Sequence, residues 1–149
     1  MRTGPQAVRD LKIWQKSIDL VEASYKLSGN LPTEERFGLV SQIRRAAASV
    51  PANIAEGFGR WNSREFVRFL AIASGSLREL ETHFVIAGRL GFLSERSVEP
   101  MFQRIDELAR MIYRMRLRVG ETLRQVRTPF EQSRKFDSRS PQKAATRSY

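Results

Sequence analysis

Arginines near the C-terminal end are the side chains of this chain best suited to a binding chemistry. Residues 110–127 contain a single carboxylate, Glu121, and six arginines: Arg110, Arg114, Arg116, Arg118, Arg124 and Arg127. The planar guanidinium group presents its donors in a fork that matches the oxygens of a phosphate group. This local excess of arginine therefore predicts contacts with phosphate, although a run of charge on a helix is more often a solvated face.

The spacing within this cluster places three of the arginines in one row. Arg110, Arg114 and Arg118 are four residues apart, so they follow one side of a helix. Like charges at this spacing repel each other, and the row therefore needs a favourable partner outside the helix. The tail adds Arg134 and Lys135, and we predict that these two residues and the six arginines form a nucleic-acid-binding surface.

Catalytic chemistry has little support in the sequence. The chain has no cysteine and one histidine, His83, which excludes thiolate catalysis and cysteine-based zinc sites. His83 follows Glu79 by four residues and Glu81 by two, whereas a di-iron bundle needs Glu-x-x-His pairs. The segment from Gly57 to Gly59 lacks the third glycine of a dinucleotide-binding loop. We therefore predict a protein without enzymatic activity, bound metal or cofactor.

The overall composition also points to an anionic partner. The 149 residues include 26 lysines and arginines against 16 acidic residues, which gives a formal net charge of +10. This charge favours nucleic acid or another anionic surface through long-range attraction. No apolar stretch approaches the roughly 20 residues of a membrane-spanning helix, and residues 1–10 lack the apolar run of a signal peptide. We expect one cytoplasmic domain without membrane contact.

Four helices must position these side chains. Apolar residues recur at helical spacing in four segments, which Gly, Pro and Ser residues separate. The pattern predicts an all-α, antiparallel up-and-down four-helix bundle over residues 10–127, with a short lead at 1–9 and a basic, flexible tail at 128–149. We expect Thr33 to cap the second helix, Ser63 to cap the third, and Ser94 or Ser97 to begin the fourth.

Each predicted helix has an apolar stripe that we assign to the core. In the first helix the stripe consists of Leu11, Trp14, Ile18, Val21 and Tyr25. The stripes of the other three helices are, in chain order, Leu39, Val40, Ile43, Ala47, Val50 and Ile54; Phe66, Leu70, Ala73, Leu77, Leu80 and Phe84; and Met101, Ile105, Leu108, Ile112, Met115 and Val119.

Two of the helices carry a second apolar stripe, which predicts an interface between copies of the chain. The second stripes consist of Ile13, Leu20 and Leu27 in the first helix and of Phe102, Ala109, Tyr113 and Leu117 in the fourth. At about 100° per residue, they lie away from the core stripe of their own helix. Single exposed apolar side chains are common, but two organised stripes favour a symmetric oligomer.

The second helix contains the main irregularities of the sequence. Pro51 removes a backbone donor, so we expect a kink or a break there. The small residues at 46–49 are expected to face those at 71–76 of the third helix. Gly57 and Gly59 are expected to end the second helix in a left-handed conformation.

Arg44 and Arg45 in the second helix are interpreted as structural, because we expect them to pair with glutamates of the bundle. Phe58 and Trp61 lie beside several arginines at the start of the third helix, where they could stack on a base. We expect packed aromatics at this turn instead.

Several segments in the same order resemble the bacterial four-helix-bundle proteins of the rRNA intervening-sequence group. The likeness covers about residues 10–120 and rests on LKIWQKSIDLV near the start, on SQIRRAAASVPANIAEGFGR at 41–60 and on EFVRFLAIASGSLRELETHFVIAGRLGFL at 65–93. It implies a homopentamer, an association with RNA, and no catalytic residues. The long basic tail after Val126, and His83 where the group more often has Gln, depart from this pattern.

A remoter similarity links the chain to the accessory protein of diversity-generating retroelements, a basic pentamer that binds nucleic acid and a reverse transcriptase. Two hypotheses follow from the residues and these resemblances. The first is an oligomeric accessory protein that contacts the phosphates of structured RNA or of an RNA–DNA intermediate. The alternative is a protein-interaction scaffold for a neighbour-encoded enzyme such as a reverse transcriptase.

Overall fold

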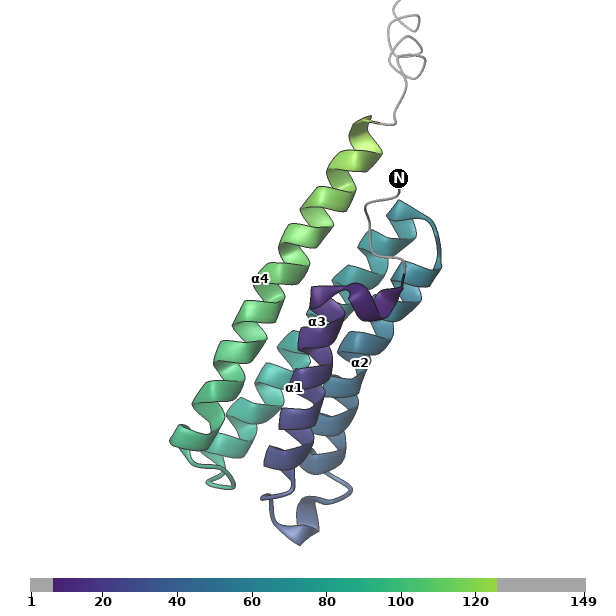
Figure 1. The fold of residues 1–149 in the computed structure, drawn as a ribbon. Helices are drawn as coiled ribbons and strands as arrows, with labels where there is room; N and C mark the ends of the chain where they lie inside the picture. Colours follow the sequence, from purple (N-terminus) through teal and green to yellow (C-terminus); the bar gives the residue numbers. More distant parts are fainter. Residues whose placement is uncertain (1–6, 126–149) are drawn as a thin grey trace, which may run out of the picture.

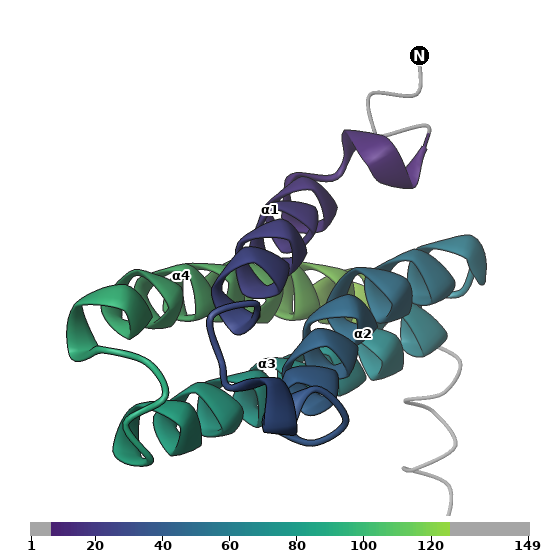
Figure 2. The same ribbon diagram turned by 90° about the horizontal axis from the view of Figure 1, so that it is seen from below.

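The computed structural model describes residues 7–125, and it forms a four-helix bundle (Figure 1). Its elements are η1 (Val8–Asp10), α1 (Lys12–Ser28), η2 (Thr33–Glu35), α2 (Leu39–Gly59), α3 (Ser63–Arg89) and α4 (Glu95–Gln125), with no strand among these residues. Each long helix packs against the next along the chain, and α1 also packs against α4, which closes the bundle. The helices alternate in direction, and Figure 2 shows α1 inclined to the other three. The predicted all-α bundle is confirmed.

The helix ends differ from the sequence prediction by a few residues. Thr33 begins the short η2 turn, and α2 starts only at Leu39, whose backbone N–H donates to Glu35 Oε2 over 2.9 Å. Asn62, rather than Ser63, caps α3, since its Oδ1 accepts hydrogen bonds from the backbone N–H groups of Arg64 and Glu65. In both cases an oxygen acceptor satisfies N–H groups that have no partner within the helix.

The core faces of α2, α3 and α4 agree with the prediction. The buried apolar residues of these helices include Ile43, Val50 and Ile54 from α2; Leu70, Leu77, Leu80 and Phe84 from α3; and Ile105, Leu108 and Ile112 from α4. Met115 is only partly buried and packs against this cluster. These residues are spaced by three, four or seven positions, which keeps them on one side of each helix.

The face of α1 that points into the bundle is turned by about 90° from the predicted one, at about 100° per residue. Leu11 is buried as predicted, and Trp14 and Val21 are partly buried against the core. Ile13 and Leu20, which the sequence pattern places at an oligomer interface, are 3% and 1% exposed and belong to the core. Ile18 and Tyr25, which the same pattern places in the core, are 38% and 44% exposed. The placement of Ile13 and Leu20 on an outer surface is therefore wrong. Leu27 is partly buried and also packs against the core.

Buried serines explain this rotation. Ser17, Ser24 and Ser28 lie on the buried side of α1. The hydroxyl of Ser17 donates to Trp14 O over 2.6 Å, and that of Ser28 donates to Tyr25 O over 3.1 Å, whereas the Ser24 hydroxyl has no partner among the described residues. A serine that bonds a carbonyl of its own helix can be buried without a lost hydrogen bond, and the small side chain of all three fits between two helices. A pattern that counts serine as a surface residue consequently selects the wrong side.

Small residues bring α2 and α3 into close contact, as predicted. Ala46, Ala47 and Ala73 are buried, and the hydroxyls of Ser49 and Ser76 lie 2.8 Å apart across the contact. Pro51 is buried within α2, which continues without a break to Gly59, so the predicted break is wrong at this position. A kink at Pro51 stays a prediction.

Gly57 has a packing role that the sequence did not indicate. It lies inside α2 and is buried, and a Cβ at this position would be 2.6 Å from Phe69 Cβ and 3.0 Å from Phe66 Cδ2. The glycine therefore permits α3 to approach α2 at the start of its course. The left-handed conformation expected for the end of α2 occurs instead at Trp61, which has a φ of 55°.

Replacing Gly57 by alanine should destabilise the bundle. The added Cβ overlaps side chains of α3 that are themselves packed, so we expect the free energy of unfolding to fall by about 1–3 kcal/mol. Gly75→Ala is the matched control, because a Cβ there meets nothing within 4 Å, and it should raise stability by about 0.5–1 kcal/mol. Urea unfolding measures the free energy of unfolding of both variants. A change in the same direction for both would contradict the packing role of Gly57.

The orientation of α1 can be tested by truncating one residue on each side. Leu20→Ala removes a side chain that is 1% exposed and should cost about 2–5 kcal/mol of unfolding free energy. Ile18→Ala removes one that is 38% exposed and should cost less than about 1 kcal/mol in dilute protein. A larger loss for Ile18→Ala than for Leu20→Ala would show that α1 is turned the other way.

Candidate nucleic-acid interface

The outer face of α4 carries an exposed row of arginines. Arg110, Arg114, Arg118 and Arg124 are all exposed. Along the helix they follow the side opposite the buried residues Met101, Ile105, Leu108 and Ile112. We call these four arginines the arginine face. They lie in the C-terminal half of α4. This helix finishes at the same end of the bundle as the turn between α2 and α3 (Figure 1).

The arginine face has no compensating carboxylate within the described residues. None of its four arginines lies within 4.0 Å of an acidic oxygen in residues 7–125. Some basic side chains elsewhere on this surface are paired, as in Lys16–Glu107 at 3.3 Å and Arg60–Glu56 at 2.6 Å, whereas others, such as Arg45, are not paired within residues 7–125. Such exposed pairs add little stability, but they do neutralise charge locally. The arginine face differs from the isolated unpaired arginines because its four charges lie on one side of one helix.

The short length of α1 leaves one flank of this face open as well. Lys16, in the second turn of α1, pairs with Glu107 near the middle of α4. Since α1 has 17 residues and α4 has 31, the last turns of α4 extend beyond the part of the helix that α1 covers. The outer side of these turns has no neighbour among the described elements.

Arg116 differs from the other arginines of α4 because it points toward α3. It is partly buried, and its Nε atom has no hydrogen-bond partner among the described residues. It lines a groove of 380 Å³ between α3 and α4, which we call the α3–α4 groove. The other lining residues are Ser74 and Arg78 from α3 and Asp106, Ala109, Arg110 and Tyr113 from α4. Sequence reasoning missed the contribution of α3, because Arg78 and Ser74 have no pattern of their own and reach the groove only through helix packing.

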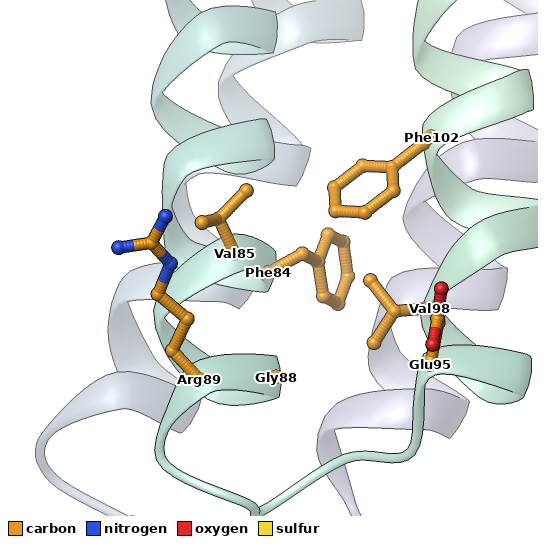
Figure 3. A pocket seen from close by; sticks show the side chains of 7 residues that line it. All are labelled: Phe84, Val85, Gly88, Arg89, Glu95, Val98 and Phe102. Carbon is orange, nitrogen blue, oxygen red and sulfur yellow. The ribbon is translucent and has the colours of Figure 1, made fainter.

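The predicted apolar stripe of α4 is divided between two environments. Phe102 is partly buried, packs against the core, and lines a smaller apolar pocket of 220 Å³ between the ends of α3 and α4. Figure 3 shows Phe102, Phe84 and Val98 converging on this pocket, while Arg89 points away from it. Tyr113 and Leu117 are 58% and 46% exposed, as a surface for a partner requires. Ala109 is partly buried against the core.

The remaining predicted binding residues lie outside the described part of the chain. Arg127, Arg134 and Lys135 belong to residues 126–149, as does the predicted flexible tail. Their part in the nucleic-acid-binding surface stays a prediction, and the arginine face is defined from α4 alone.

Arg44 has a structural role, but not the predicted one. Its Nε donates to Ser28 Oγ over 3.0 Å, and its guanidinium group lies 4.7 Å from the centre of the Tyr25 ring. It therefore binds the C-terminal end of α1, where the free carbonyl groups favour a cation. No carboxylate pairs with Arg44 or with the exposed Arg45 within residues 7–125, so the predicted glutamate pairs are wrong.

The turn between α2 and α3 is only half packed. Phe58 makes an edge-to-face contact with Phe66, with ring centres 6.1 Å apart, as expected for a packed aromatic. Trp61 is 84% exposed, so the expectation of a packed side chain is wrong there. Nearby, a hydrogen bond from Arg68, assisted by its charge, lowers the pKa of Glu65. Arg60 and Arg68 are thus both engaged with glutamates.

The other candidate residue for chemistry is His83, which lies on α3 beside a glutamate. His83 Nε2 lies 3.6 Å from Glu79 Oε1, and its ring nitrogens are buried without a hydrogen bond among the described residues. Within residues 7–125, no group of three His, Cys, Asp or Glu side chains is placed to hold a metal ion. None of the described helices combines the length and the apolar character that crossing a membrane requires.

Comparison with known proteins identifies relatives of the bundle. A solved structure from Bacteroides thetaiotaomicron, described as a protein with unknown function from the S23 ribosomal protein family, matches with a TM-score of 0.64. The two sequences are 22% identical, and the match covers 69% of this chain and 96% of that chain. At this identity the likeness supports the fold alone. No curated protein matches the chain.

The family comparison extends over most of the bundle. The model of the 23S rRNA-intervening sequence proteins matches residues 9–114, from the lead into α1 to the first half of the arginine face. Arg116, Arg118 and Arg124 lie just beyond this range. The match includes all three segments that carry the resemblance in the sequence. The chain therefore belongs to the 23S rRNA-intervening sequence protein family.

Proposed function

We propose that this protein is a non-enzymatic, cytoplasmic, nucleic-acid-binding accessory protein that contacts phosphates through the arginine face of α4. The observation that carries the proposal is the exposure of Arg110, Arg114, Arg118 and Arg124 on one side of a helix, without a carboxylate partner in residues 7–125. Each arginine that meets a phosphate releases condensed counterions, so a small cluster contributes substantial affinity at low salt.

The preference for RNA rests on the family description, which refers to 23S rRNA. Contacts with phosphates read no sequence, so the arginine face is expected to bind structured RNA, or an RNA–DNA intermediate, by its backbone. The same face could meet an acidic protein surface, such as that of a neighbour-encoded reverse transcriptase. We favour nucleic acid because three unpaired arginines at intervals of one helical turn, Arg110, Arg114 and Arg118, suit a regularly spaced chain of phosphates.

We also propose that the protein is a homopentamer, as the resemblance to its family implies. Two sets of apolar side chains that are exposed or half-buried support self-association. One is the stripe of Trp14, Ile18, Val21 and Tyr25 on α1, and the other consists of Ile72, Ile86 and Leu90 on α3, with Glu79 between them. Tyr25 lies beneath Arg44 of α2, and Ile72 is one turn from Ser76, whose hydroxyl contacts Ser49 of α2. The two sets therefore flank α2, on the side of the bundle opposite the arginine face.

This arrangement leaves α4 free for a polyanion. An interface built on Tyr113 and Leu117 would instead bring the arginine faces of two copies together, and like charges oppose such a contact. A ring that keeps the arginine faces outside would present several of them to one nucleic acid, which increases the apparent affinity without any new contact.

Removal of the arginine row should weaken binding and reduce its dependence on salt. We expect the triple variant Arg110→Ala, Arg114→Ala, Arg118→Ala to lower the slope of log affinity against log salt by about two to three, as counterion release predicts for three lost phosphate contacts. Fluorescence anisotropy with a labelled duplex RNA at several salt concentrations measures this slope.

The matched control for this experiment removes the same charge from other faces. Arg36, Arg45 and Arg96 are exposed and lie outside the arginine face, and their triple alanine variant should keep most of the slope. Equal losses for the two variants would mean that net charge alone drives binding. An unchanged affinity for the first variant would exclude the arginine face. If the protein binds an acidic partner protein after nuclease treatment and does not bind RNA, the result would favour the protein-interaction scaffold.

The oligomer can be tested with one charge on each candidate surface. Light scattering should give a pentamer for the unmodified protein and a smaller species for Ile18→Asp, since the charge would be buried between copies. Leu117→Asp should leave the mass unchanged. A monomer in the unmodified protein at micromolar concentration would contradict self-association, and dissociation by Leu117→Asp alone would move the interface to α4.

A further inference from the structure

The α3–α4 groove combines features of a nucleotide site. We propose that it binds one unpaired nucleotide, with the phosphate held by Arg110 and Arg116 and the base stacked on Tyr113. This inference rests on the proposed nucleic-acid binding and adds a preference that the arginine face alone lacks. Its volume of 380 Å³ falls within the range of about 300–1,000 Å³ that is typical of small-ligand pockets.

Arg116 supplies the first argument. Its side chain is partly buried, and the Nε–H group is shielded from solvent without an acceptor in residues 7–125. A buried donor of a charged group is unfavourable unless it is paired, so this side chain favours a nearby anion. The two Nη groups of Arg116 are not among the shielded atoms, and Arg116 has no acidic partner among the described residues. A phosphate in the groove would accept hydrogen bonds from these Nη groups.

The charges along the groove indicate where the phosphate would lie. Arg78 is already engaged, since its Nη1 lies 2.7 Å from Glu81 Oε2 and 3.9 Å from Asp106 Oδ1. Arg110 and Arg116 have no such partner among the described residues. Along α4, Asp106 is at one end of the groove and Arg116 at the other. An anion is repelled by Asp106 and is therefore drawn toward the Arg116 end.

Tyr113 supplies the surface for a base. It lies between Arg110 and Arg116, three residues from each, and its side chain is 58% exposed. A base stacks on an aromatic ring with little regard to its identity, and only a base that is free of its own stacking neighbours can do so. The groove therefore selects an unpaired nucleotide, such as one in a loop or bulge, whereas the arginine face accepts paired and unpaired strands alike.

The test compares single-stranded and duplex RNA on the full-length protein. The probes are a labelled 12-nucleotide oligouridylate and a labelled 12-base-pair blunt RNA duplex, measured by fluorescence anisotropy. Tyr113→Ala should weaken binding of the oligouridylate by about fivefold or more, from the usual strength of base–aromatic stacking, and change duplex binding by less than about twofold. Tyr113→Phe should retain the affinity for both, because the ring is kept.

Two further variants separate the groove from its surroundings. Leu117→Ala is the matched control, because Leu117 is a similarly exposed residue one turn along α4 that does not line the groove. It should leave both affinities unchanged. Arg116→Gln should weaken oligouridylate binding and reduce the magnitude of its salt slope by about one, as expected for one lost phosphate contact. Uridine 5′-monophosphate should displace the oligouridylate from the unmodified protein, whereas inorganic phosphate at the same concentration should displace less.

The possible results distinguish this inference from the proposed function. If the unmodified protein binds neither RNA, the proposed function fails. If the unmodified protein binds both RNAs, and Tyr113→Ala either keeps both affinities or weakens both equally, the nucleotide site is overturned. The arginine face stands in that case. Equal losses for Leu117→Ala and Tyr113→Ala would likewise overturn it. Displacement of the oligouridylate by polyglutamate as readily as by RNA would assign the groove to an acidic peptide.

Discussion

The close approach of α2 and α3 is the constraint on which the rest of the bundle depends. It is possible because alanine, serine and glycine line the contact, with the Ser49 and Ser76 hydroxyls paired at 2.8 Å and Gly57 against Phe66 and Phe69. Close-packed interiors tolerate little change in volume, so this contact fixes the rotation of α3 about its axis. That rotation directs Leu77, Leu80 and Phe84 into the core and leaves Arg78 at the edge shared with α4. The α3–α4 groove is a consequence of how α3 meets α2.

Helix α1 is held by small buried side chains and by a contact at its C-terminal end. Its buried side alternates Ile13 and Leu20 with serines, and Arg44 of α2 binds its C-terminal end through Ser28 and the Tyr25 ring. Ser17 and Ser28 satisfy their own hydroxyls locally, so α1 can lie close to the core without a large apolar surface. The apolar residues that remain on α1 are then left outside, where Ile18 and Tyr25 are more than a third exposed. The packing that holds α1 close to the core therefore leaves an apolar stripe exposed on its outer side.

The sequence predicts the elements better than their surfaces. Helices α2, α3 and α4 have long stripes of large apolar residues, and in α4 the core stripe of six residues outweighs the second stripe of four, so their cores follow from spacing. In α1 two apolar stripes of similar size compete, and the choice depends on whether serine is buried, which periodicity does not decide. The exposure of Trp61 and the role of Gly57 both depend on how two helices meet at a turn. The row of arginines on α4 could be predicted from spacing alone, whereas the groove beside it needed the relative positions of α3 and α4.

The position of the arginine face on α4 determines how much of it is open. The face lies opposite the buried residues of α4, so it is solvated along the helix whatever the length of the other helices. Helix α4 has 31 residues and α1 has 17, and at about 1.5 Å per residue this difference makes α4 longer by about 20 Å. Because α1 does not accompany the last turns of α4, the flank beside Arg114 and Arg118 is open as well. The repulsion between the arginines is small at a solvated surface, and a polyanion would convert it into attraction. The extension of α4 beyond α1 thus widens a positive surface that the outward direction of the arginines already creates.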